Sequence, residues 1–367
     1  MDGLLPVGGL MIVGLYKLMK VDKDKGTNLV LTSISGKDEL PFKMAPLIFL
    51  STVISHFFGA SVGREGAALQ LGGSLGNTIG ESFGFRECDR KILIMTGMSA
   101  AFSALFGTPA AAAVFAVEVA VIGTMYIQAL LPCVIAAYTA SRLPLAIGIK
   151  PERLPLGNVP DMSFVLILKL VVLAGLCGVL AIVFCVVMKK TKIYSEKLIK
   201  NPWLRVVAGA AVFIGITALT RSTDYYGTGM NVIERAVTEG EAVPYAFALK
   251  LVLTALMLGV GFKGGEIVPT FFVGATFGCV IGKLLGISPG LAAAAGMASL
   301  FCGVTNCPFA AAIMCFELFG FESAPYILIV TAISYAVSGY CSLYSGQYCD
   351  VSKYSLKMGD TGENTDN

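Results

Sequence analysis

The 367-residue sequence has few charged residues, and it contains a single histidine and a single tryptophan. Only 14% of its residues are Asp, Glu, Lys or Arg, whereas about 25% is usual for a soluble domain. So few charges cannot cover the water-facing surface of a soluble protein of this length. Because 56% of the residues are hydrophobic, we expect lipid to surround most of the chain.

Residues that carry enzyme chemistry are also scarce. The ten cysteines show no zinc-ligand or redox spacing, and most lie inside apolar stretches, which favours a packing role. An intramembrane hydrolase would need a nucleophile with a base, but no glycine-serine-glycine elbow accompanies His56. We therefore expect no enzyme activity, no metal and no cofactor, and we expect no nucleic acid as a partner.

Apolar runs of unequal length recur along the chain. Several approach the roughly 20 residues that cross a bilayer as a helix, and only helices or closed barrels satisfy the backbone in lipid. The pattern predicts an all-α polytopic membrane protein. The runs are Leu4–Tyr16, Ala45–Phe58, Ile122–Tyr138, Phe164–Met188, Val206–Leu219, Ala246–Val260 and Ala324–Tyr340.

Two lysine clusters suggest which ends of the spans are cytoplasmic. Positive charge is commoner in cytoplasmic loops than in external ones, although a merely solvated loop would also explain the clusters. One cluster follows the first run, and the other follows the longest run. Their members are Lys17, Lys20, Lys23 and Lys25, and Lys189, Lys190, Lys192, Lys197 and Lys200.

The chain contains an internal duplication. The segment Gly97–Glu118 matches Gly296–Glu317 without a gap, including a shared proline and a shared terminal glutamate, and Gly72–Gly80 parallels Gly274–Gly282. We infer two related halves, 1–150 and 151–349, followed by a polar, disordered tail, 350–367. The first half lacks a counterpart of the helix that opens the second.

A glycine-rich interruption lies at the equivalent place in each half. Gly63–Gly66 reads Gly-Arg-Glu-Gly, and Gly264–Pro269 reads Gly-Gly-Glu-Ile-Val-Pro. A helix that begins at membrane depth exposes amide N–H groups and the positive end of its dipole, which together attract an anion. Glycine kinks for close helix packing are the alternative. The repetition favours a shared anion site.

The Gly-Arg-Glu-Gly motif with Gln70, the Gly97–Glu118 segment and the Gly-Gly-x-x-x-Pro element resemble, in this order, the CLC family of anion channels and exchangers. The resemblance covers nearly the whole chain. It implies a CLC-type inverted repeat of broken, tilted helices and a homodimer with one pore per subunit. Glu65 then resembles the gating glutamate, which competes with the anion when ionised and withdraws when protonated; a salt bridge with Arg64 or a helix cap is the alternative.

The resemblance also assigns an anion-binding set. Tyr344 matches a late tyrosine whose hydroxyl points at the central anion, and the backbone N–H groups of the second glycine-rich element correspond to second-half donors. An aromatic anchor at the membrane interface is the alternative for Tyr344. The implied set is Thr27, Asn28, Gly66, Glu266, Ile267 and Tyr344.

Two departures argue against an ordinary chloride exchanger. Gly26–Val30 replaces the usual Gly-Ser-Gly-Ile-Pro, and Val119 stands where an internal proton-transfer glutamate is expected. The Gly-Gly-Glu around Glu266 and the Tyr-x-x-Gln ending at Gln347 resemble the fluoride/proton antiporter branch. We therefore expect a multi-pass protein of a bacterial-type plasma membrane that exports fluoride against protons; chloride transport on the same fold is the alternative.

Two roles are possible for each of four further side chains. Glu118 and Glu317 end repeat-related helices, where capping or a subunit contact is favoured over a direct role in transport. His56 precedes the gate loop, and an orienting hydrogen bond is favoured over a proton role. Glu266 belongs either to the proton path or to the cap of its helix.

Overall fold

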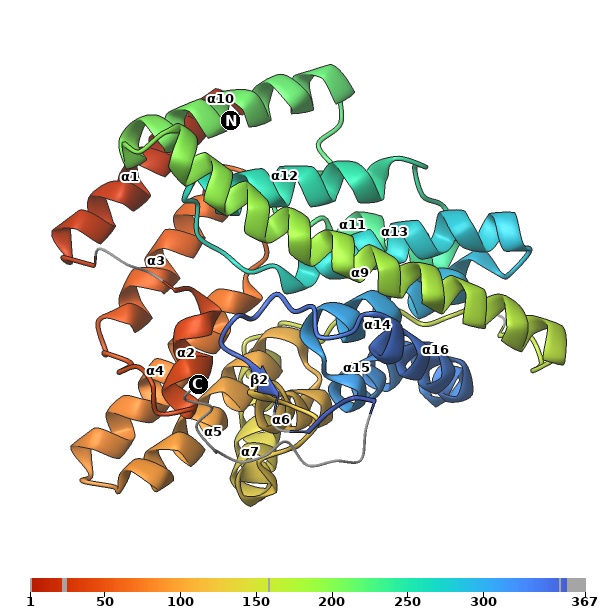
Figure 1. Cartoon of the computed structure of the whole chain (residues 1–367), viewed down its shortest axis with the longest axis horizontal. Coiled ribbons are helices and arrows are strands. Elements are labelled where there is room, and N and C mark those ends of the chain that lie inside the picture. Colours follow the sequence, from red (N-terminus) through yellow and green to blue (C-terminus); the bar gives the residue numbers. More distant parts are fainter. Residues whose placement is uncertain (1, 22–24, 158, 350, 355–367) are drawn as a thin grey trace, which may run out of the picture.

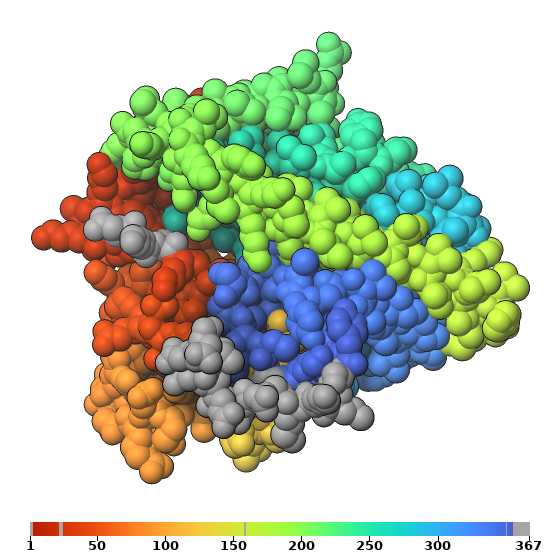
Figure 2. Space-filling model, viewed as in Figure 1, coloured from red at the N-terminus to blue at the C-terminus, as the bar shows by residue number. Residues whose placement is uncertain are grey.

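The structure, a computed structural model, describes residues 2–21, 25–157, 159–349 and 351–354. These residues are almost entirely helical, as the apolar runs predict (Figure 1). In Figure 1 most of the first half, in red to yellow, lies below and to the left of the green to blue second half, and Figure 2 shows the same division on the surface.

The first half contains eight α-helices among the described residues. Its elements are η1 (Asp2–Leu4), α1 (Leu5–Leu18), α2 (Thr27–Ile34), α3 (Met44–Phe57), α4 (Glu65–Ser82), α5 (Glu87–Phe106), α6 (Pro109–Glu118), β1 (Val121–Ile122), η2 (Ile127–Ala129), α7 (Leu130–Ala140) and α8 (Arg142–Ala146).

The second half opens with the longest helix. Its elements are α9 (Phe164–Leu198), α10 (Pro202–Thr220), α11 (Met230–Glu234), a π-helical turn η3 (Arg235–Glu239), α12 (Ala246–Val260), α13 (Ile267–Leu285), α14 (Pro289–Thr305), α15 (Pro308–Phe319), η4 (Phe321–Ser323), α16 (Ala324–Val337) and β2 (Tyr348–Cys349).

Within the described part of the chain, four helical segments are long and apolar enough to cross a membrane: Ile127–Ala146, Phe164–Leu198, Pro202–Thr220 and Ile267–Leu285. The expected span Ile122–Tyr138 is wrong at its start, because Val121–Ile122 forms β1 and Gly123 turns the chain with a φ of 89°. The expected Phe164–Met188 is too short. The helix continues through a lysine-rich segment to Leu198, because lysine and glutamate have high helix propensity.

The repeated glycines let the helices of each half pack closely. A Cβ atom on Gly72 of α4 would overlap the carbonyl of Gly97 in α5, and one on Gly274 of α13 would come within 2.6 Å of the carbonyl of Gly296 in α14. Any side chain at these positions would push the helices apart. The two halves therefore build the same helix pair with the same contact.

Glu118 at the end of α6 and Glu317 in the last turn of α15 each cap the start of the other helix. The carboxylate of Glu118 accepts hydrogen bonds from the amides of Phe309 (3.1 Å) and Ala310 (2.8 Å) at the start of α15. Glu317 accepts from Ala110 (3.1 Å) and Ala111 (2.9 Å) at the start of α6. Each helix ends where the other begins, so the two run antiparallel. These contacts are helix caps, which is one of the two roles favoured for both glutamates.

The carboxy-terminal segment returns to the end of the first half. Tyr348–Cys349 pairs in parallel with Val121–Ile122, so β2 lies beside β1. Beyond it, Lys353 donates to the side chain of Asn306 (2.5 Å) and the hydroxyl of Tyr354 donates to the carbonyl of Ala336 (2.6 Å). Residues 351–354 are therefore bound to the folded body, and the rest of the expected tail, 355–367, lies outside the described residues.

Candidate functional site

The two glycine-rich interruptions meet each other directly. The amide of Gly63 donates to the carbonyl of Gly265 (2.7 Å), and the amide of Gly265 donates back to Gly63 (2.8 Å), in an antiparallel bridge. Two residues beyond each glycine a helix begins, α4 at Glu65 and α13 at Ile267. The bridge therefore places the positive ends of two repeat-related helix dipoles side by side.

The Glu65 carboxylate lies between these helix ends and is fully buried. Its Oε1 accepts from the amide of Arg64 (3.0 Å), and its Oε2 accepts from the amide of Val268 in the first turn of α13 (3.3 Å). An anion arriving at the same place would need the same amide.

The expected second-half donors, Glu266 and Ile267, directly precede the residue whose amide contacts Glu65. The amide that meets the carboxylate belongs to Val268, not to Glu266 or Ile267. Glu266 is the residue before α13, and Ile267 is its first residue. Both amides still point out of the same helix end, because the first N–H groups of a helix have no partner inside it. The repeat signals the helix end but not which of its amides is used.

A third helix begins beside the first two. Gly26, with a φ of 60° and a ψ of −144°, precedes Thr27, the first residue of α2. The Oγ1 atom of Thr27 lies 3.0 Å from where a Cβ on Gly66 would be, so glycine at position 66 allows α2 to approach α4. Asn28 points elsewhere: its Oδ1 accepts from the amide of Gly346 (2.9 Å) and ties α2 to the Tyr344 loop.

Tyr344 is only 2% exposed. Its backbone is held by a hydrogen-bond cluster. The amide of Tyr344 donates to the hydroxyl of Ser342 (3.0 Å), which donates in turn to Oε1 of Gln347 (2.5 Å).

The amide nitrogen of Gln347 completes the cluster. Nε2 donates to the carbonyls of Val119 and Thr305, each at 2.7 Å. Gln347 thus joins the Tyr344 loop to the ends of α6 and α14, one from each half. The sequence motif pointed to Gln347, but its role in holding the loop emerges only from these contacts.

A basic cavity of about 350 Å³ leads to the site. It contains lysines from both sequence clusters, although Lys23 itself lies outside the described residues. The Oε1 atom of Gln70, a residue 2% exposed, faces no hydrogen-bond partner among the described residues. We name this cavity the basic vestibule; its polar lining includes Lys25, Thr27, Asn28, Gln70, Lys189, Lys192, Lys263 and Glu266.

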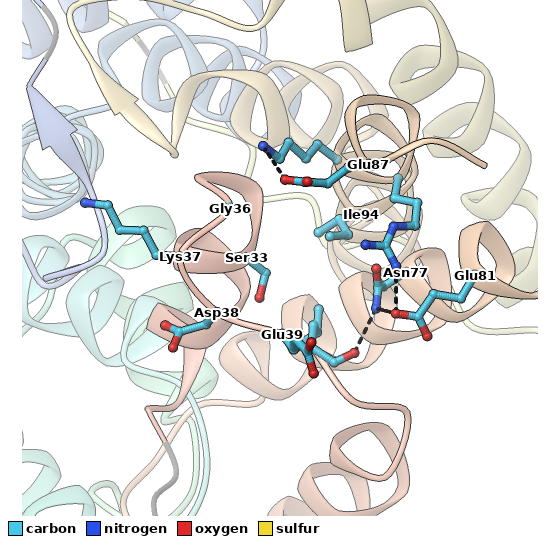
Figure 3. A pocket seen from close by; sticks show the side chains of 12 residues that line it. Ser33, Gly36, Lys37, Asp38, Glu39, Asn77, Glu81, Glu87 and Ile94 are labelled. Carbon is cyan, nitrogen blue, oxygen red and sulfur yellow. Dashed lines mark hydrogen bonds and ion pairs between the residues drawn. The ribbon is translucent and has the colours of Figure 1, made fainter. Parts of the chain in front are cut away.

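A second cavity of about 350 Å³ lies at the far end of α4 (Figure 3). Three of its polar side chains are linked: Asn77 donates to the carbonyl of Leu40 (2.9 Å) and to Glu81 (2.9 Å), and Arg90 pairs with Glu81 (3.0 Å). At 1.5 Å per helical residue, Glu81 lies about 24 Å along α4 from Glu65. This cavity is separate from the anion site.

His56 and Arg64 lie near the gate residue Glu65 in the chain. His56 lies at the end of α3, and its buried Nε2 atom has no hydrogen-bond partner among the described residues, so the orienting hydrogen bond stays a prediction. Arg64 turns away from Glu65 and pairs with Glu152 in the segment between the halves (3.1 Å). The alternative of a salt bridge between Arg64 and Glu65 is therefore wrong, because Arg64 pairs with Glu152 instead.

Lys250 is the residue that sequence reasoning missed. It is fully buried in α12, and it is the only charged residue in the run Ala246–Val260. A lysine isolated in an apolar span was visible in the sequence, and an ionisable residue inside a membrane marks a functional position by default.

The fold and the site define an integral membrane protein in which helix ends from two related halves surround a place for an anion. The chain belongs to the CLC family: the family model described as voltage gated chloride channel matches residues 8–339.

Several relatives are similar over most of their length. A chloride/fluoride channel protein of Pseudomonas syringae pv. tomato is 36% identical over 358 residues, which cover 96% of this chain and 79% of that protein. A voltage-gated ClC-type chloride channel, ClcB, of Escherichia coli is 26% identical over 345 residues, covering 90% of this chain and 81% of that protein.

Solved structures have the same fold. A crystal structure of a CLC-type fluoride/proton antiporter superposes with a TM-score of 0.90 at 34% identity, covering 94% of this chain and 88% of the other. The structure of a slow cyanobacterial Cl⁻/H⁺ antiporter superposes with a TM-score of 0.79 at 20% identity, covering 91% and 82%, and supports the fold alone.

Proposed function

We propose that the chain exports fluoride from the cell in exchange for protons. The observation that carries the proposal is the position of the Glu65 carboxylate, which receives hydrogen bonds from the amides of Arg64 and Val268 between two helix ends. When ionised, Glu65 occupies the anion position. When protonated, it loses its attraction to the helix dipoles and leaves room for an anion.

Fluoride is favoured over chloride by the similarity to a fluoride/proton antiporter and to a chloride/fluoride channel protein. It is also favoured by Val119, which occupies the position of the internal glutamate expected in chloride exchangers. Fluoride is strongly hydrated, so it needs several well-directed donors to replace its water. The amides of α4 and α13 supply them, together with the hydroxyls of Thr27 and Tyr344.

We place the cytoplasmic entrance at the basic vestibule. Lys189 and Lys192 from α9 and Lys25 before α2 line one cavity with Thr27 and Glu266. Positive side chains at a narrow mouth raise the local anion concentration. The vestibule therefore provides an anion entry, and the same positive-charge rule places it on the cytoplasmic side of a bacterial plasma membrane.

We propose that two copies associate in the membrane. The contact in this proposal lies on the helices that include the end of the Gly97–Glu118 segment, as the family resemblance implies. Apolar side chains face outward there: Leu131 of α7 is 69% exposed, Phe309 of α15 61% and Leu328 of α16 53%. Cross-linking of single cysteines at these positions in vesicles would trap a dimer, and lipid would cover the remaining apolar surface.

The test of function is flux in reconstituted vesicles. A fluoride gradient imposed across liposomes that contain the chain should drive proton movement in the opposite direction, recorded as a change of internal pH. A chloride gradient of the same size serves as the comparison. Equal proton coupling with both anions would favour the chloride alternative, and anion flux without proton movement would favour a channel.

A further inference from the structure

Lys250 lies in the middle of α12 and is fully buried. Among the described residues, no acidic side chain forms an ion pair with it. Removing an ammonium group from water without a counter-charge is costly, and lysine is among the residue types least often fully buried. Packing alone would be served better by leucine or methionine. Packing therefore does not account for a lysine at this position.

The ammonium group is held by backbone carbonyls. Nζ donates to the carbonyls of Gly227 (2.7 Å) and Tyr225 (3.2 Å), and it lies 5.3 Å from the ring centroid of Phe272 in α13. Tyr225 and Gly227 belong to the connection between α10 and α11. Lys250 thus fastens this connection to the middle of α12.

The same connection holds the segment that leads to the gate. The amide of Gly227 donates to the carbonyl of Ala60 (3.1 Å), which also accepts from the amide of Val62 (2.9 Å). One helical turn beyond Lys250, the hydroxyl of Thr254 lies 3.4 Å from that of Ser61. Two positions of α12 therefore hold residues 60–62, directly before the Gly63–Glu65 bridge and gate.

Lys250 also lies against the second helix of the gate: its Nζ is 5.3 Å from the ring centroid of Phe272 in α13, and the Val268 amide in the first turn of α13 donates to Glu65. The other titratable or charged groups around Glu65 are His56 of α3, Arg64, Glu266 at the start of α13 and Tyr344. Arg64 is partly exposed and paired with Glu152, so water and a carboxylate screen its charge. Lys250 is the cation near the gate that is shielded from water, where an electrostatic interaction is strongest.

We propose that Lys250 is a positioning residue for the gate: it holds residues 60–62 through the 225–227 connection, and its ammonium group, when charged, stabilises negative charge in the site. That negative charge is the Glu65 carboxylate in one state and fluoride in the other, so the inference rests on the proposed function. Removing the charge disfavours both states.

Three substitutions separate charge from anchoring. Lys250→Gln keeps an amide N–H donor for the carbonyls and loses the charge. Lys250→Met keeps the approximate shape and loses both. Lys250→Arg keeps both. Lys169→Gln is the matched control, because Lys169 also donates to a backbone carbonyl, that of Gly286 (3.0 Å), but lies on an exposed part of α9 away from the gate.

The full chain would be measured in two ways: fluoride binding by calorimetry in detergent, and the pH dependence of fluoride-driven proton uptake in vesicles. For K250Q we expect fluoride affinity to fall about tenfold and the pH of half-maximal coupling to rise by about one unit, because a carboxylate without a nearby cation holds its proton to higher pH. K250M should show the same changes with lower thermal stability. K250R should restore both measurements to within about threefold.

Wild-type fluoride affinity and an unchanged pH midpoint in K250Q would overturn the proposal, and so would equal changes in K169Q. A loss confined to K250M would overturn the charge role, since it would leave anchoring as the sole effect. A wild-type protein that binds fluoride but moves no protons would instead contradict the proposed function. In that case the affinity series still tests whether Lys250 stabilises a bound anion.

Discussion

The Oε2 atom of Glu65 and the amide nitrogen of Val268 lie 3.3 Å apart, although 203 positions separate them in the sequence. One residue begins the helix of the first half, and the other lies in the first turn of the corresponding helix of the second. Their contact depends on the paired Gly63 and Gly265 backbones, which lack side chains that would hold the two helix ends apart.

Replacing Glu65 by glutamine should abolish the coupling of protons to fluoride. Glutamine has nearly the same shape but does not ionise, so it neither carries a proton nor competes as an anion for the Val268 amide. We expect fluoride-driven proton uptake in vesicles to fall to the level of vesicles without protein. Persistent coupled exchange in the variant would remove Glu65 from the mechanism.

Replacing Tyr344 by phenylalanine should weaken fluoride binding without unfolding the protein. The ring remains packed, and one hydroxyl donor is lost from the site. A single hydrogen bond contributes about 0.5–1.5 kcal/mol, so we expect a two- to tenfold lower affinity by calorimetry. Identical binding by both proteins would reduce Tyr344 to a packing residue.

Replacing Gln347 by leucine should impair the site indirectly. The carbonyls of Val119 and Thr305 and the hydroxyl of Ser342 would each lose a partner in a buried region, at a cost of about 1–3 kcal/mol for each unsatisfied group. We expect lower thermal stability together with weaker fluoride binding, because the Tyr344 loop loses its attachment.

Gln347→Glu is a second variant that tests the same hydrogen bonds. Its carboxylate keeps the shape but repels the two carbonyls. A leucine variant with full fluoride affinity would show that the Tyr344 loop is held adequately without this side chain.

Neutralising the vestibule lysines should slow fluoride entry. We expect Lys189→Gln combined with Lys192→Gln to lower the initial rate several-fold at low ionic strength, and the difference from wild type to shrink at high salt as screening replaces the lost effect. Lys190→Gln is the control, because Lys190 is exposed on the same helix and does not line the cavity. A deficit that is independent of salt would exclude electrostatic attraction as its cause.

Replacing Glu118 by alanine should affect stability more than transport. The carboxylate satisfies two amides at the start of α15, and loss of such a cap costs about 1–2 kcal/mol. We expect a lower melting temperature in detergent and an unchanged ratio of protons to fluoride in vesicles. Glu317→Ala should behave alike because it caps α6, and a change of the exchange ratio in either variant would assign a proton role to that glutamate.

The membrane class, the internal duplication and the approximate positions of most helices could be predicted from the amino-acid sequence, although Ile122–Tyr138 was wrong at its start and Phe164–Met188 was too short. Hydrophobicity and internal repetition can both be measured directly on the amino-acid sequence. The breaks before Glu65 and Ile267 were also readable, because a helix interrupted by glycine exposes its amides wherever it lies in the membrane.

Which side chains and amides come into contact depends on the packing of the folded chain. The apolar run Ala246–Val260 predicted α12, but that Lys250 points toward the connection at 225–227 depends on how α12 packs against residues far away in the chain. The use of the Val268 amide and the clamp of Gln347 on Val119 and Thr305 likewise require angles and distances between elements. A linear pattern carries no such information, because the free energy of these contacts arises from groups that come together only when the chain folds.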